Sequence, residues 1–75
     1  MHAICLTIRH EDTPKGFESY LCKFMSRYYQ SVQVRFGNQE NILLDGAPTE
    51  SEIQTAWMLL DAAGSEYYEQ QLQLA

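Results

Sequence analysis

The sequence predicts an α+β domain, a two-layer β-α-β-β-α sandwich in which a three-stranded mixed sheet carries two helices on one face. Two observations lead to this fold class. Residues 3–8, 32–36 and 42–44 are short apolar stretches bounded by polar or turn-forming residues, as β-strands are. Residues 13–30 and 49–63 instead repeat apolar side chains every three or four positions, which is the spacing of a helix that buries one face.

The first strand, residues 3–8, has two different faces. One face consists of three branched apolar residues: Ile4, Leu6 and Ile8. The other consists of three small or mildly polar residues: Ala3, Cys5 and Thr7. Because neither face is charged, we expect this strand to be central in the sheet or covered on both sides.

The first helix is expected to begin at Thr13-Pro14, because Thr can cap a helix and Pro fits its first position. Its buried face is predicted from four aromatic or aliphatic residues at spacings of four, three and four: Phe17, Leu21, Phe24 and Tyr28. We expect this helix to end near Gln30.

The second and third strands follow this helix. Val32, Val34 and Phe36 alternate with polar residues, which predicts a half-buried strand parallel to the first. Residues 37–40 have the composition of a turn, and residues 42–44 form a third short strand. A connection of four residues predicts that these two strands pair as an antiparallel hairpin.

The second helix is expected to begin with a capping box, in which the side chains of Thr49 and Glu52 can each accept a hydrogen bond from the other's backbone N–H. Seven residues are expected to form its core-facing arc: Ile53, Ala56, Trp57, Leu60, Ala63, Gly64 and Tyr67. Gly64 weakens a helix, so we expect the helix to end or bend near Ala63 and residues 65–75 to form a last turn or a frayed tail.

Length and composition indicate one small domain, residues 1–75. Two cysteines are too few for a disulfide framework, and no stretch has the character of a signal peptide or a membrane span. We therefore expect a cytoplasmic protein that does not bind a membrane.

Charge is distributed unevenly along the chain, whose net charge is −5. Residues 1–37 contain all five basic residues and three acids, whereas residues 38–75 contain seven acids and no Lys or Arg. A net acidic chain repels phosphate backbones, so we expect no direct nucleic-acid binding and instead a protein partner with a basic surface.

The second helix is the candidate docking element. Five acids could form an acidic ridge on it: Glu50, Glu52, Asp61, Glu66 and Glu69. Four apolar residues lie outside its core-facing arc: Met58, Leu59, Tyr68 and Leu72. The alternatives are an ordinary solvated helix face and the scattered apolar exposure of any small domain. Met58 and Leu59 could also form the seam of a homodimer.

Catalytic signatures are scarce. The chain has no glycine-rich phosphate loop, no Cys-x-x-Cys pair and no nucleophile elbow. His2 and His10 are expected to be solvated, and Cys5 and Cys22 to be structural. We therefore expect a non-enzymatic protein without a metal or cofactor. The catalytic alternative is a phosphocarrier-like domain with His10 as the phosphoryl acceptor.

Several short motifs resemble the DinI-like family of DNA-damage-inducible proteins. They are Pro14-x-Gly16 and Ser26-Arg27 around the first helix, Val32-x-Val34-Arg35-Phe36, Asn41-Ile42-Leu43, Gly46-Ala47 and the Thr–acidic start of the second helix. The resemblance covers roughly residues 3–69. The chain departs from the family in a shorter connector after the first helix and in a less acidic end of the second.

The resemblance implies a regulator of the SOS response that binds the RecA recombinase filament through its acidic second helix. On this chain the role would belong to the five acids of the ridge, with Tyr67 and Tyr68 near the aromatic helix end. Together with Met58, the predicted partner-binding residues are Glu50, Glu52, Asp61, Glu66, Tyr68 and Glu69. The alternative is a phage- or plasmid-borne acidic inhibitor that imitates nucleic acid for another host DNA-processing enzyme.

Overall fold

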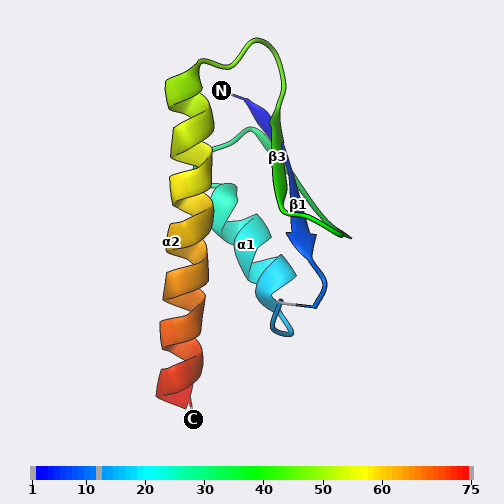
Figure 1. The fold of residues 1–75 in the computed structure, drawn as a ribbon. Helices are drawn as coiled ribbons and strands as arrows, with labels where there is room; N and C mark the ends of the chain where they lie inside the picture. Colours follow the sequence, from blue (N-terminus) through cyan, green and yellow to red (C-terminus); the bar gives the residue numbers. More distant parts are fainter. Residues whose placement is uncertain (1, 12, 75) are drawn as a thin grey trace.

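The computed structural model describes residues 2–11 and 13–74 and confirms the predicted fold class. The elements are β1 (Ala3–Arg9), α1 (Phe17–Met25), β2 (Ser31–Gly37), β3 (Asn41–Leu44) and α2 (Glu50–Leu74). The strands form one layer, and the helices lie together against it, with α2 the longest element of the molecule (Figure 1).

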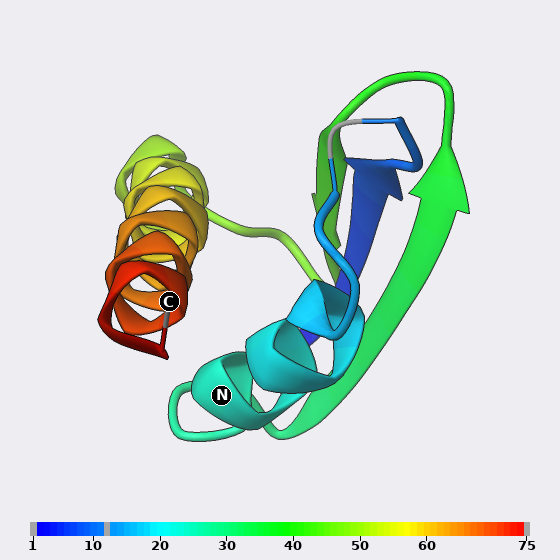
Figure 2. The same ribbon diagram turned by 90° about the horizontal axis from the view of Figure 1, so that it is seen from below.

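The sheet has the order β2-β1-β3, so β1 is the central strand. It pairs in parallel with β2, as predicted, and antiparallel with β3. The predicted hairpin between β2 and β3 is wrong, because residues 38–40 pass across the end of β1 and place β3 at the opposite edge (Figure 2). This order satisfies the main chain of β1 on both sides, as its mild composition permits.

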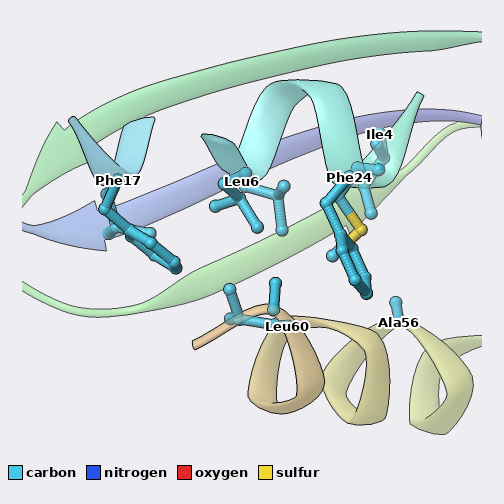
Figure 3. Close-up of a cluster of buried hydrophobic side chains, with 10 residues drawn as sticks. Ile4, Leu6, Phe17, Phe24, Ala56 and Leu60 are labelled. Atoms are coloured by element: carbon cyan, nitrogen blue, oxygen red, sulfur yellow. The ribbon is translucent and has the colours of Figure 1, made fainter. Parts of the chain in front are cut away.

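The core lies between the helices and one face of the sheet. Its buried members come from three elements: Ile4, Leu6 and Ile8 of β1, Phe17, Leu21, Phe24 and Met25 of α1, and Ala56, Leu60 and Ala63 of α2. In Figure 3, Leu60 and Ala56 point from α2 toward side chains of β1 and α1. The opposite sheet face, with Cys5, Gln33 and Leu43 in one row, carries no helix.

Helix α1 is shorter than predicted at both ends. It begins at Phe17, after Gly16 with φ of 91°, because the Thr13 hydroxyl donates to the Arg9 carbonyl and so does not cap the helix. It ends at Met25, where the chain tightens: the Tyr28 N–H donates to the Met25 carbonyl at 2.9 Å. Tyr28 lies beyond the helix and is 46% exposed, so it does not continue the buried face.

Helix α2 is longer than predicted. The capping box forms, with the Glu52 N–H donating to Thr49 Oγ1 at 3.2 Å and the Thr49 N–H to Glu52 Oε1 at 2.9 Å. The expected end or bend near Ala63 is wrong, because the helix continues through Gly64 to Leu74. Ala75, the last residue of the expected tail, lies outside the described residues.

A contact with a distant segment holds the turn that follows Gly64. The Tyr67 hydroxyl donates to the Lys15 carbonyl at 2.7 Å, and the Tyr67 ring packs 5.4 Å from Phe17 and 5.0 Å from Tyr20. A glycine inside a helix costs only about 1 kcal/mol relative to alanine. The contacts of Tyr67 offset this cost, and the helix continues past Gly64.

Two glycines should respond oppositely to alanine. We expect Gly16→Ala to lower the free energy of unfolding by about 1–3 kcal/mol, because Gly16 has a positive φ and a Cβ there would lie 2.8 Å from the Tyr67 hydroxyl. We expect Gly64→Ala to raise it by about 1 kcal/mol, since a Cβ there meets nothing within 4 Å. Urea titrations of both variants measure the effects, and equal changes would contradict the account.

Candidate protein-binding face

One side of α2 faces away from the core and is exposed along nearly its whole length. We call it the outer face. Its charged and large apolar members fall within an arc of about 100° on a helical projection, and they are Glu50, Met58, Asp61, Tyr68, Glu69 and Leu72. Three of them are large apolar residues with high exposure: 69% for Met58, 65% for Tyr68 and 59% for Leu72. Five of the seven predicted partner-binding residues therefore lie together.

The outer face combines carboxylates with apolar side chains. Met58 lies one turn before Asp61, and Tyr68 is adjacent to Glu69. Apolar anchors surrounded by charge are typical of surfaces that bind another protein, because the anchors supply affinity and the charges supply orientation.

The acids of α2 are not balanced by bases. No Lys or Arg occurs in the helix, and no basic residue stands in its last turn, where positive charge would complement the helix dipole. Glu66 and Glu69 are three positions apart, a spacing at which like charges cost a few tenths of a kcal/mol. Glu66 and Glu69 therefore do not add to the stability of the helix, whereas Glu50 and Glu52 in its first turn complement the dipole.

Two predicted members of the acidic ridge lie on another side of α2. Glu52 is bound within the capping box and to His2, so its carboxylate is already engaged in contacts within the molecule. Glu66 lies toward α1, where burial and then a hydrogen bond to the Glu66 carboxylate raise the pKa of Tyr20. The predicted ridge of five acids is thus divided between two sides of the helix.

The predicted homodimer seam of Met58 and Leu59 is also divided. Met58 is on the outer face, whereas Leu59 is half-buried and packs against the core. Because Leu59 packs against the core, Met58 carries most of the exposed surface of this pair.

His2 is not the solvated residue that the sequence predicted. Its Nδ1 lies 2.9 Å from the Asp45 carbonyl oxygen, and its Nε2 contacts the Glu52 carboxylate. Asp45 in turn accepts the Ala3 N–H at 2.9 Å. These contacts join the beginning of β1 to the connection between β3 and α2 and to the first turn of α2. No sequence signal links residues 43 and 50 positions apart, so only the fold reveals this cluster.

The two partners of this pair shift each other's ionisation. The pKa of His2 is raised, first by its hydrogen bond to Glu52 and then by the Asp45 carbonyl. The pKa of Glu52 is lowered to about 2, first by the Thr49 N–H and then by His2. Both imidazole nitrogens have acceptors, so the arrangement favours the protonated, charged ring.

A groove adjoins the C-terminal half of α2. It has a volume of about 830 Å³ and separates this part of the helix from the segment between β1 and α1. Ile8, Phe17 and Tyr67 contribute apolar surface to it, and Arg9 and Glu11 contribute charge. Tyr68 belongs to both the groove and the outer face, so the two surfaces are continuous. Sequence analysis did not identify this groove, because its walls come from segments far apart in the chain.

Three further candidate residues from the sequence are His10, Cys5 and Cys22. His10 is exposed, with its ring 4.8 Å from that of Phe36, and Cys5 and Cys22 are half-buried free thiols. Within residues 2–11 and 13–74, no group of three or more His, Cys, Asp or Glu side chains is placed to hold a metal ion. In the same part of the chain, no helix combines the length and apolar character needed to cross a membrane.

Comparison of the chain with protein-family models, with curated proteins and with solved structures found no match.

The pH dependence of stability should identify the His2–Glu52 contact. The pKa of His2 is raised on folding, so its contribution is complete below the unfolded value of 6.5 and is lost as pH rises through the folded value. Glu52 behaves oppositely: its contribution is complete above 4.5 and is lost as pH falls toward about 2. We expect His2→Gln to abolish the decline in stability of the wild-type protein between about pH 6 and 8.

Thermal unfolding followed by circular dichroism at closely spaced pH values measures this profile. The matched control is His10→Gln, which removes the other histidine and leaves the Glu52 contact intact. An unchanged slope in His2→Gln, or the same change in both variants, would contradict the proposed role of His2.

The Tyr67 hydroxyl should hold the C-terminal half of α2. We expect Tyr67→Phe to lower the free energy of unfolding by about 1 kcal/mol and to speed amide exchange after residue 64, because the bond to the Lys15 carbonyl is lost. Tyr68→Phe is the control, since that side chain is 65% exposed. Equal exchange rates in both variants would argue against this anchor.

Proposed function

We propose that this chain is a non-enzymatic regulator that binds a basic surface of a protein partner through the outer face of α2. The partner class that we favour is a RecA-type recombinase filament, which places the protein in the control of the SOS and DNA-damage response. The supporting observation is the composition of the outer face, where three acids, Glu50, Asp61 and Glu69, lie with exposed Met58 and Tyr68. Residues 38–75, which include this face, contain no Lys or Arg. The motifs shared with the DinI-like family suggest the filament as the partner.

The shape of α2 suits an elongated contact. Glu50 and Glu69 are nineteen residues apart on one helix, which corresponds to about 28 Å along its axis. Carboxylates spread over this length would attract a basic groove before contact, which raises the association rate at low salt. Met58 and Tyr68 would then be buried and would slow dissociation.

Nucleic-acid imitation is the second candidate, and the spacing of charge bears on it. From Glu50 to Asp61 and from Asp61 to Glu69 the axial distances are about 16 and 12 Å, whereas a DNA strand carries one charge per roughly 3.4 Å. The outer face is therefore much less densely charged than a phosphate backbone. A mixed apolar and acidic contact is the mode that this spacing favours.

Charge reversal on the outer face should weaken the complex. We expect Glu50→Lys, Asp61→Lys and Glu69→Lys each to lower affinity for a RecA-type filament by about three- to tenfold at low salt, mostly through the association rate. We expect the three losses to shrink near 1 M salt, where the Debye length is about 3 Å. Fluorescence anisotropy with filaments assembled on single-stranded DNA measures both effects.

Matched variants separate this effect from misfolding and from net charge. Glu18→Lys makes the same charge change at an exposed position in the first turn of α1, outside the outer face and the groove that adjoins it, and should retain affinity. Glu69→Lys should unfold at the same temperature as the wild type or higher, because it removes the like-charge neighbour of Glu66. Equal losses in Glu18→Lys, or no filament binding at low salt, would refute the proposal, and capture of another DNA-processing enzyme would support the second candidate.

A further inference from the structure

The outer edge of β2 is an exposed strand edge. β2 is seven residues long and forms one border of the sheet, whereas β3 at the other border has four residues (Figure 2). Alternate residues of an edge strand direct their N–H and C=O groups outward, and proteins usually protect such an edge with prolines, bulges or several charges. β2 contains no proline, and Arg35 is its single charged residue.

Apolar side chains line the helix-facing side of this edge. Val32, Val34 and Phe36 lie opposite Ile4, Leu6 and Ile8 of β1 and so share the core-facing side of the sheet. Phe36 is nevertheless 41% exposed, and Val32 and Val34 are only half-buried. One more strand beside β2 would cover these side chains.

The residues of β2 are complementary to themselves in an antiparallel arrangement. A two-fold axis at Val34 pairs all seven residues with a second copy. Val32 then faces Phe36, which is a favourable cross-strand pair of a β-branched and an aromatic residue, and Gln33 faces Arg35. A register centred on Arg35 would instead pair fewer residues and place two guanidinium groups opposite each other, while one centred on Gln33 also pairs fewer residues.

The position of α1 is compatible with this arrangement. α1 packs beside β2, and α2 packs beside β3 at the other side of the sheet. The two-fold axis makes α1 antiparallel to α1 of the second copy. The first turn of one helix, with Glu18, is then directed toward the last turn of the other, with Lys23, and like charges are kept apart.

We propose that β2 pairs antiparallel with β2 of a second copy of this chain, centred on Val34, to form a dimer with a continuous six-stranded sheet. This interface lies at the β2 edge of the sheet, whereas α2 packs beside β3 at the other edge. It therefore differs from the expected Met58–Leu59 seam. The outer faces of both α2 helices remain accessible. A repetitive partner would therefore meet two docking helices on one particle, and binding would gain from avidity.

Opposite charges at position 33 test the register. Gln33 is exposed and faces Arg35 of the second copy, and the two-fold axis makes this pair occur twice. We expect Gln33→Glu to tighten dimerisation by about tenfold and Gln33→Arg to weaken it by about tenfold. Sedimentation equilibrium between about 1 µM and 1 mM measures the dissociation constants, and we expect both differences to diminish near 1 M salt.

Two further measurements keep the test specific. Gln73→Glu and Gln73→Arg make the same changes at an exposed position on α2 and should leave dimerisation unchanged. Amide exchange in β2 should slow as concentration rises through the dissociation constant. A monomer at every concentration in both wild type and Gln33→Glu would overturn the proposal, as would equal effects at positions 33 and 73 or β2 exchange independent of concentration. The measurements contain no other partner, so their outcome is independent of the function proposed above.

Discussion

The structure depends on the burial of one face of β1. Ile4, Leu6 and Ile8 are 3%, 0% and 2% exposed and form the surface on which both helices pack. Burial of each such side chain contributes about 1.5–3 kcal/mol. A strand with this role must be central, and its other face must tolerate partial exposure without charge, which Ala3 and Cys5 satisfy.

The central position of β1 determines which surfaces remain open. Because β1 pairs on both sides, β2 and β3 become the two borders of the sheet. Because both helices pack on one face, α2 uses a narrow strip of its surface, including Ala56, Leu60 and Ala63, to attach itself. The opposite side of a 25-residue helix is then free to carry Asp61 and Glu69, which the packing of the helix does not require.

Helix α2 is fixed in its first turn and in its second half by contacts with distant segments. Glu52 meets His2 near the first turn, and Tyr67 meets the Lys15 carbonyl in the second half. Held in this way, the helix presents its outer face as a rigid surface, which lowers the entropy lost on binding a partner. The contacts of Glu52 and Tyr67 thus hold α2 in place and, in doing so, fix the position of its outer face.

Local patterns were enough for the fold class, the parallel pairing of β1 with β2 and the capping box of Thr49 and Glu52, because each depends on neighbouring residues or on short-range periodicity. Five of the seven predicted contact residues lie on one face for the same reason: helical spacing alone brings them together. Three features required the folded chain: the position of β3, the continuation of α2 through Gly64 and the bonds of His2. Each depends on contacts between segments that are far apart in the chain, and the free energy of such contacts has no counterpart in the spacing of adjacent residues.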